Sequence, residues 1–150
     1  MNDILEFKNE YDFLSNMYPC EVTYKGITYK CSEAAFQAQK YNSEGIKKEF
    51  AEYDGKQAKW HGGPRGDHKL TKEEVSSWND RRISVMEEVV KAKFEQNQDL
   101  KKKLMETGNA MIYEGRAFRP DRFWGINLKT MEGQNHLGII LMNLRDSFSK

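Results

Sequence analysis

The stretch T-Y-K-C-S-E-A-A-F-Q-A-Q-K-Y, residues 28–41, decides the fold that we expect for this chain. It is typical of a strand end that runs into a short helix. Ser32 is the expected N-cap of that helix, because its hydroxyl can accept a free backbone N–H of the first turn. Glu33 then stands at the first helical position, where the helix dipole favours a carboxylate.

Four side chains are expected to share one face of this short helix. At about 100° per residue they fall within roughly one 100° arc, and they are Glu33, Phe36, Gln37 and Lys40. A solvated charged face is the ordinary interpretation of such residues on an isolated helix, and it stays open here. Phe36 in the middle of the polar residues argues against it. We therefore take this face as the candidate wall of an active site.

Composition indicates a globular protein with a real core. The chain has 150 residues, of which 38% are hydrophobic and 31% charged, so we expect one domain over residues 1–150. A net charge of +1 gives no global argument for binding nucleic acid or an anionic membrane. Cys20 and Cys31 lack a C-x-x-C partner, and neither a signal peptide nor a membrane-length apolar run is visible. We therefore expect reduced thiols, no membrane association and a cytoplasmic location.

Local patterns predict a helix-dominated α+β fold with a small β-hairpin. Alternation on both sides of Lys25-Gly26 predicts the hairpin over residues 20–30. A capping box at 71–74 predicts the start of a helix, which is strongly periodic from Trp78 to about Gln96. Within it, one apolar stripe is expected to contain Ile83, Met86, Val90 and Phe94, and a second Val85, Val89 and Ala92.

Several shorter elements complete the expected fold. The helix continues or restarts over 97–106 and ends at a glycine C-cap, Thr107-Gly108. Asn135 is expected to cap a last helix that turns Leu137, Ile140, Leu141 and Leu144 to the core. The remaining segments are predicted as an ordered loop at 11–19, a short helix at 43–51, a turn at 55–60, a strand at 110–113 and a long loop at 116–134. Loops as long as the last one are usually functional.

Familiar catalytic motifs are missing from the sequence. It contains no G-x-S-x-G elbow, no G-x-x-x-x-G-K-[ST] loop and no G-x-G-x-x-G. His61, His68 and His136 do not have metal-ligand spacing, so we predict neither a metal nor a cofactor. Cys31 has no obvious His partner that would activate it as a nucleophile. Carboxylate chemistry supported by aromatic and amide contacts remains.

Two further polar clusters carry candidate residues. D-R-F-W-G at 121–125 sets an aromatic pair beside an acid, although Trp124 as a core plug is an equally good interpretation. G-Q-N-H-L-G at 133–138 combines flexible glycines with amides at a helix N-terminus, which suits a phosphate or a ribose. The alternative for this second cluster is a simple helix cap.

Five stretches of the chain together resemble one known family. They are F-L-S-N-M-Y-P at 13–19, Y-K-C-S-E-A-A-F-Q-A-Q-K at 29–40, W-x-x-x-R…V-M-E-E-V-V-K-A-K-F-E-Q-N at 78–97, F-W-G at 123–125 and G-Q-N-H-L-G-x-x-L-M-x-x-R at 133–145. They occur in the family order and span nearly the whole chain. On these motifs the chain resembles the NADAR superfamily, also called YbiA-like, whose members include the riboflavin-biosynthesis-intermediate N-glycosidase.

The resemblance implies a single α+β domain that hydrolyses an N-glycosidic bond. That bond joins a phosphorylated ribose, or ADP-ribose, to an amine or a base nitrogen. Known family activities concern ribosylamino-pyrimidine intermediates of riboflavin synthesis and the removal of ADP-ribose from guanine in DNA. The expected partners are therefore a small ribosyl-phosphate or ADP-ribose substrate, or ADP-ribosylated DNA. The alternative is a non-catalytic module that binds ADP-ribose or another NAD-derived nucleotide. The oligomeric state is not predicted.

Site residues are carried over from the family motifs. Glu33 is expected to act as general base or electrostatic stabiliser, held by Lys40, with Asp121 as a second acid or a ribose ligand. The expected substrate-binding residues are Asn16, Phe36, Gln37, Lys59, Trp78, Trp124, Gly125, Asn135 and Arg145. The lysines would bind phosphate together with the helix start at Asn135, while the aromatics stack on the base and the asparagines hold ribose hydroxyls. A structural salt bridge is the alternative role for Arg145.

Two segments depart from the family pattern. Many relatives of the riboflavin-intermediate type have A-K-x-L-G-R where this chain has A-K-W-H-G-G-P-R at 58–65. Lys59 and Gly62 match, but the arginine is displaced and the loop is longer. Residues 114–119 also fit only loosely. We expect both segments to border the pocket, so the leaving group stays open.

Overall fold

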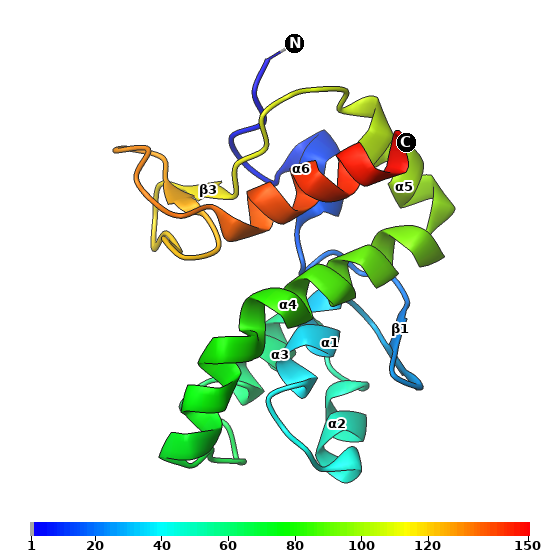
Figure 1. Cartoon of the computed structure of the whole chain (residues 1–150). Coiled ribbons are helices and arrows are strands. Elements are labelled where there is room, and N and C mark those ends of the chain that lie inside the picture. The colour runs from blue at the N-terminus through cyan, green and yellow to red at the C-terminus, as the bar shows by residue number, and fades with distance from the viewer. Residues whose placement is uncertain (1) are drawn as a thin grey trace. The chain divides into compact units, whose positions relative to one another are not determined.

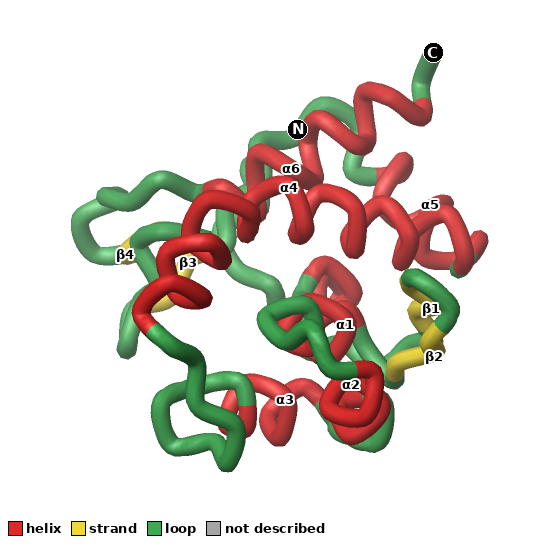
Figure 2. The backbone as a smooth tube through the Cα atoms, turned by 60° about the horizontal axis from the view of Figure 1, so that its bottom comes forward, coloured by secondary structure: helices red, strands yellow, loops and turns green. Residues whose placement is uncertain are grey.

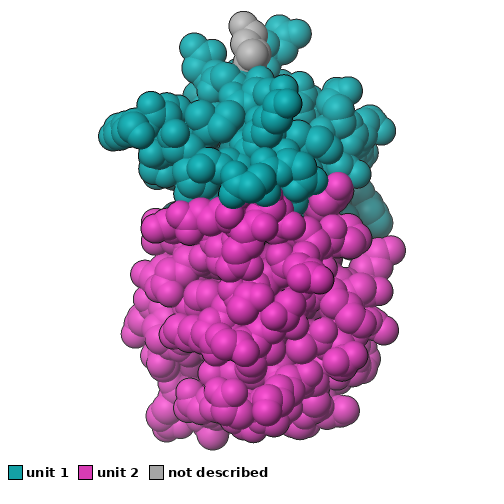
Figure 3. All heavy atoms as spheres, turned by 90° about the vertical axis from the view of Figure 1, so that its right-hand side faces the viewer, with its two compact units in different colours: residues 1–15, 98–150 teal, residues 16–97 magenta. Residues whose placement is uncertain are grey.

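The structure is a computed structural model that describes residues 2–150, and the chain divides into two compact units (Figure 3). The central unit is residues 16–97. The terminal unit contains both ends of the chain, residues 1–15 and 98–150. Helices dominate both units, and each holds one two-stranded sheet. The predicted α+β class with a small β-hairpin is confirmed. A single domain over residues 1–150 stays a prediction.

The central unit is built around one short helix. Its elements are β1 (Val22–Tyr24), β2 (Ile27–Tyr29), α1 (Ser32–Ala38), α2 (Glu44–Phe50), α3 (Gly55–His61) and α4 (Lys72–Gln96) (Figure 1). Helix α1 contacts the other three helices and both strands, and all seven of its residues are buried. In Figure 2, α1 lies between α4 and the pair α2 and α3. A helix covered on every side has no solvated face, so its polar side chains must find partners within the protein.

The predicted hairpin is confirmed. Strands β1 and β2 are antiparallel, with Val22 opposite Tyr29, and Lys25 and Gly26 both take positive φ angles of 49° and 84°. Two successive left-handed residues match the twist of the flanking strands, which is why tight hairpin turns favour them. The side-chain amide of Gln96, at the end of α4, then pairs with the open edge of β1. Its Oε1 accepts from the Thr23 N–H at 2.7 Å, and its Nε2 donates to the Thr23 carbonyl at 2.8 Å.

Two predictions about helix starts in the central unit were wrong. Cys31, not Ser32, is the N-cap of α1, and no side chain caps that helix; the Ser32 hydroxyl instead donates to Asn16 Oδ1 at 2.9 Å. Residues 55–60 form helix α3 rather than a turn, because Asp54 and Gln57 make a capping box. The predicted capping box of α4, at Thr71 and Glu74, is confirmed.

The apolar stripes of α4 are confirmed only in part. Val85, Met86, Val89, Val90 and Phe94 are buried, but Ile83 is 37% exposed. Ala92 is only half-buried, whereas the neighbouring Lys93 is 1% exposed and lies with its ammonium over the rings of Tyr18 and Phe94. A lysine stem can fill apolar space in this way when its ammonium finds an electron-rich ring.

The terminal unit packs two helices and short strands around its own core. Its elements are a 3-10 helix (Asn9–Leu14), α5 (Gln98–Glu106), β3 (Gly115–Arg116), β4 (Ile126–Asn127) and α6 (His136–Phe148). Strands β3 and β4 are parallel, and α5 packs on α6. The four predicted core residues of α6 are buried, and Gly108 ends α5 with a φ of 64°, as expected of a glycine C-cap.

The loops of this unit differ from expectation in three places. Residues 11–14 of the predicted loop belong to the 3-10 helix, which begins at Asn9, and the predicted strand at 110–113 is reduced to one bridge between Ile4 and Ile112. Strand β4 interrupts the long loop at 116–134. Within residues 2–150, no helix combines the length and the apolar character that crossing a membrane requires.

The Gln96 amide provides a first test of the central unit. Replacing Gln96 with alanine should lower the free energy of unfolding by about 1 kcal/mol, because two partly exposed hydrogen bonds to the β1 edge are lost. Urea unfolding followed by circular dichroism measures this change. Lys91→Ala, at an exposed position of the same helix, is the matched control. Equal midpoints for the two variants would contradict the bracing role of Gln96.

Candidate active site

Glu33 lies in the first turn of α1 and is held from two sides. It is 9% exposed, and its backbone N–H donates to the Asn16 carbonyl at 3.0 Å. One turn later, Gln37 donates its Nε2 to Glu33 Oε2 at 2.7 Å. A buried carboxylate is costly unless hydrogen-bond donors surround it. The amide of Gln37 is one such donor, and it fixes the direction of the carboxylate.

Asn16 fastens the start of α1 to the chain that precedes the hairpin. Its Oδ1 accepts from the Ser32 hydroxyl, and its Nδ2 donates to the sulfur of Met86 at 3.3 Å. Together with the bond from the Glu33 N–H, these contacts place the first turn of α1 relative to α4. The observed contacts of Asn16 therefore position Glu33. Ribose binding by Asn16 stays a prediction.

Lys40 follows α1 and carries the second charge of the cluster. Its ammonium donates to the Gly62 carbonyl, at the end of α3, with Nζ and O 2.7 Å apart. Burial lowers the pKa of Lys40 below its ordinary value, and the charge of Arg82 lowers it further. The Glu33 charge acts in the opposite direction and raises it. Glu33 thus favours the charged form of Lys40, and the expected role of Lys40 in holding Glu33 stays a prediction.

Aromatic residues complete this part of the cluster. The rings of Phe36 and Trp78 meet with centroids 5.0 Å apart, tilted by 56°. The Arg81 guanidinium carbon lies 5.2 Å from the centre of the Trp78 ring, and Lys40 Nζ lies 6.0 Å from it. Both distances fall in the range of a cation–π interaction. Trp78 therefore links α1, the helix that carries Glu33, to α4. The other predicted lysine of the site, Lys59, lies exposed on α3.

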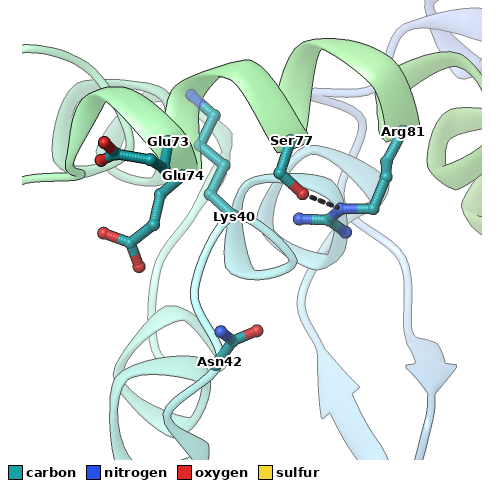
Figure 4. Close-up of a pocket in the computed structure, with 6 residues that line it drawn as sticks. All are labelled: Lys40, Asn42, Glu73, Glu74, Ser77 and Arg81. Carbon is teal, nitrogen blue, oxygen red and sulfur yellow. Dashed lines mark hydrogen bonds between the residues drawn. The ribbon is translucent and has the colours of Figure 1, made fainter.

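A surface cleft gives access to Lys40. Its volume is about 230 Å³, and it is lined by Lys40, Asn42, Glu73, Glu74, Ser77 and Arg81. In Figure 4, Lys40 extends toward α4, with the two glutamates on one side and Ser77 and Arg81 on the other. Arg81 donates weakly to Ser77 Oγ and to the Gln39 carbonyl, each at 3.4 Å. The cleft therefore presents carboxylates at one end and donors at the other.

In the terminal unit, Asp121 organises a turn. Its Oδ1 accepts from the backbone N–H groups of Phe123 and Trp124, at 2.9 and 2.8 Å, and its carbonyl accepts from Gly125. Gly125 is required there, because a side chain would overlap the Glu114 carbonyl oxygen. These contacts account for the F-W-G motif as local structure. Catalysis by Asp121 and substrate binding by Trp124 and Gly125 stay predictions.

The start of α6 is closed by backbone hydrogen bonds. The N–H groups of residues 134–137 donate in turn to the carbonyls of Arg122, Gly125, Phe123 and Trp124. Asn135 is the N-cap, as predicted, but it has a φ of 53° and its side chain does not cap the helix. Its amide instead donates to the Ile112 carbonyl and accepts from the Glu114 N–H. The N–H groups of His136 and Leu137 are thus already used within the protein, which argues against phosphate binding there, and the expected help of this helix start in binding phosphate stays a prediction.

Arg145 is buried within the terminal unit. Its Nη1 donates to Thr107 Oγ1 at 2.9 Å, and the same hydroxyl donates to the Leu104 carbonyl near the end of α5. A cation at a helix C-terminus is stabilised by the helix dipole. The observed contact is therefore a hydrogen bond that joins α6 to α5. Substrate binding by Arg145 stays a prediction.

Metal ligands and reactive thiols are a separate question. Within the described part of the chain, no three or more His, Cys, Asp and Glu residues lie close enough together to hold a metal ion. Burial raises the pKa of the Cys31 thiol, so the neutral form dominates at neutral pH. The chemistry that the central unit offers is therefore that of a buried carboxylate, Glu33, and a half-buried amine, Lys40.

Known proteins match this chain over nearly its whole length. The NADAR domain model matches residues 5–149. The chain belongs to the NADAR domain family. It is 29% identical over 141 residues to the N-glycosidase YbiA of Escherichia coli, which covers 94% of this chain and 84% of that protein. The solved structure of E. coli YbiA matches with a TM-score of 0.80 and 30% identity, over 99% of this chain and 87% of that one.

A longer relative is also similar. A riboflavin biosynthesis protein of Vibrio vulnificus is 33% identical over 143 residues, which is 92% of this chain. The NADAR chain spans only 36% of the length of that relative. The matched part corresponds to one segment of a larger protein, so the similarity concerns this domain and not the remainder of the Vibrio protein.

The predicted site residues of this NADAR chain fall into two sets. In the central unit, hydrogen bonds, ring contacts or charge connect Asn16, Glu33, Phe36, Gln37, Lys40 and Trp78. Lys59 belongs to the same unit and lies exposed on α3. Asp121, Trp124, Gly125, Asn135 and Arg145 belong to the terminal unit. The structure adds Gly62 and Arg81 to the central set. The position of Arg81, one helical turn after Trp78, could have indicated from the sequence that Arg81 lies against the Trp78 ring. The sequence does not indicate which glycine of the pair at 62–63 accepts from Lys40.

The lowered pKa of Lys40 makes stability depend on pH. Between the folded-state pKa and the ordinary 10.5, the unfolded chain binds a proton that the folded chain has released, so the contribution of Lys40 to stability rises with pH in that window. The free energy of unfolding of the wild-type chain, minus that of Lys40→Met, should therefore increase as pH rises toward 10.5. Urea unfolding at successive pH values measures it, with exposed Lys56→Met as control. A difference that falls with pH would contradict the burial effect.

Proposed function

We propose that this chain is an N-glycosidase. It would cleave the C–N bond between a phosphorylated ribose, or ADP-ribose, and an amine or base nitrogen. The observation that carries this proposal is the buried Glu33 carboxylate, which accepts a hydrogen bond from the Gln37 amide, while the Asn16 carbonyl accepts from the Glu33 backbone N–H. The Glu33 charge also favours the protonated form of Lys40. The similarity to N-glycosidases named YbiA supports it.

The proposed reaction uses the carboxylate in one of two ways. Cleavage of the glycosidic bond leaves positive charge on the sugar, in an oxocarbenium-like transition state. Glu33 either stabilises that charge or accepts a proton from the attacking water, whose oxygen forms the new bond to the anomeric carbon. The departing nitrogen keeps the bonding electrons and takes up a proton. The amide of Gln37 holds one carboxylate oxygen throughout.

Two lysines are proposed to bind the phosphate of the substrate. Lys40 supports Glu33 electrostatically, and together with Lys59 it binds the phosphate of the substrate. Trp78 and Phe36 provide aromatic surface beside Lys40 for the base. Asn16, Trp124, Gly125, Asn135 and Arg145 are proposed substrate-binding residues on the family motifs alone.

Two substrates fit this chemistry. A ribosylamino-pyrimidine phosphate is favoured by the similarity to a riboflavin biosynthesis protein. ADP-ribosylated guanine in DNA is the second, and a net charge of +1 weakly disfavours it because binding a long duplex needs many phosphate contacts. A single nucleotide turned out of the duplex needs only a few such contacts.

A non-catalytic module that binds ADP-ribose is the alternative function. The two functions differ in turnover. The unmodified chain is incubated with each substrate, and released base or ADP-ribose is followed by chromatography. Product from either substrate supports the enzyme, whereas tight ADP-ribose binding with no product from either supports the module.

Glu33→Gln tests the central assignment. The variant retains an oxygen that can accept the Gln37 hydrogen bond, so its melting temperature should stay close to that of the wild type. Turnover should fall by about 100-fold or more, which is typical of a lost general base. Glu87→Gln, at an exposed position of α4, is the matched control. Undiminished hydrolysis by a folded Glu33→Gln protein would refute the role of Glu33.

Asp121→Asn separates the charge of that residue from its structural contacts. Asparagine retains the oxygen that accepts from Phe123 and Trp124, so the turn should persist and thermal stability should change little. If the carboxylate takes part in the reaction, turnover should fall by about tenfold or more. Steady-state kinetics on the preferred substrate decide it. Wild-type turnover in the variant would show that Asp121 has only a structural role, which is to hold the turn.

A further inference from the structure

Gly62 occupies a position that its backbone does not explain. It is the C-cap of α3, with φ of −84° and ψ of −4°, a conformation that any amino acid adopts. Its N–H donates to the Ala58 carbonyl at 2.9 Å, as in an ordinary helix end. Glycine is therefore not required here for conformational freedom, and the reason for it lies in what surrounds the residue.

The space that a side chain would fill is taken by Gln37. A Cβ added at Gly62 would overlap Gln37 Oε1 and lie 2.9 Å from Gln37 Cδ. Within residues 2–150, that Oε1 is buried and has no hydrogen-bond partner, although Gln37 is only 7% exposed. An unpartnered buried acceptor is unfavourable, typically by about 1–3 kcal/mol. The fold tolerates this arrangement at the residue that holds Glu33.

The orientation of the Gln37 amide follows from these two neighbours. Its nitrogen faces Glu33, which accepts a hydrogen bond at 2.7 Å, and its oxygen faces the α-carbon of Gly62. The reverse orientation would set two oxygens against each other at Glu33. A side chain at position 62 would push the carboxamide away, and the bond to Glu33 would lengthen or break.

The same glycine also holds Lys40. Its carbonyl oxygen accepts from Lys40 Nζ at 2.7 Å. One residue thus contacts both charged members of the proposed site, Lys40 directly and Glu33 through Gln37. Loss of either contact would change the geometry of the carboxylate relative to the amine.

We propose that Gly62 is a positioning residue for the reaction. Its missing side chain sets the direction of the Glu33 carboxylate by way of Gln37, and its carbonyl sets the position of the Lys40 ammonium. The proposal rests on the proposed N-glycosidase function. It assigns Gly62 no contact with the substrate.

Gly62→Ala is the variant that tests it, and Gly45→Ala is the matched control. A Cβ at Gly45, on α2, would meet only Ser43 Oγ at an ordinary 3.6 Å. We expect Gly62→Ala to lower kcat by about tenfold or more while KM changes less, because misdirecting a catalytic carboxylate by an ångström is costly. Gly45→Ala should leave both constants unchanged. Wild-type kcat in a folded Gly62→Ala protein would overturn the proposal.

A double-mutant cycle separates positioning from general damage to the fold. Gln37→Ala removes the carboxamide that the new methyl group would strike. Gly62→Ala should therefore reduce kcat much less in the Gln37→Ala background than in the wild type, with a coupling of about tenfold. If the two effects simply multiply, the methyl group acts elsewhere and the proposal is wrong.

Nitrogen NMR of the Gln37 side-chain amide tests the geometry without turnover. The resonance is assigned by its loss in Gln37→Ala. Gly62→Ala should shift it and speed its exchange with solvent, and Gly45→Ala should not. If the wild-type chain turns over neither substrate, the proposed function fails, yet this measurement still decides whether Gly62 orients Gln37. An unmoved resonance in Gly62→Ala would overturn the inference.

Discussion

The structure of the central unit depends on the complete burial of α1. All seven residues of this helix are inside, including Ser32, Glu33 and Gln37, whose polar groups lose water on folding. Removing a carboxylate from water costs several kcal/mol unless donors replace the solvent. The Gln37 amide supplies a donor to the Glu33 side chain, and Asn16 accepts from its backbone. The contacts that make burial tolerable are therefore those that direct the proposed catalytic group.

Close packing around α1 follows from small residues. Ala34, Ala35 and Ala38 are fully buried, which lets the neighbouring helices approach the axis of α1. Gly62 continues this pattern from the side of α3, because its α-carbon lies against the Gln37 side chain. Interiors at this density transmit small changes in volume, so an added methyl group moves its neighbours instead of filling a void. The close packing around α1 therefore also fixes the geometry of the proposed site.

Sequence patterns predicted what neighbours in the chain decide. The hairpin at Lys25-Gly26, the capping box at Thr71 and the apolar stripe of α6 each depend on residues a few positions apart, and all three are confirmed. The errors arise where distant segments compete. Ser32 does not cap α1 because its hydroxyl donates to Asn16 instead. Lys93 is buried with its ammonium over the rings of Tyr18 and Phe94. The role of Gly62 depends on α1, whose packing on α3 no local pattern encodes.

Family motifs alone do not separate residues that fold the chain from residues that react. Asp121 and Asn135 make hydrogen bonds that fully account for a turn and a loop anchor. The central cluster differs from these two residues, although Arg145 Nε in the terminal unit is likewise buried without a hydrogen-bond partner in the described chain. Burial lowers the pKa of Lys40, and Gln37 retains a buried acceptor without a partner in the described chain. Apolar residues would pack there with less expense to stability. Unfavourable features of this kind persist where function needs them, so the polar face of α1 is the stronger candidate for the chemistry.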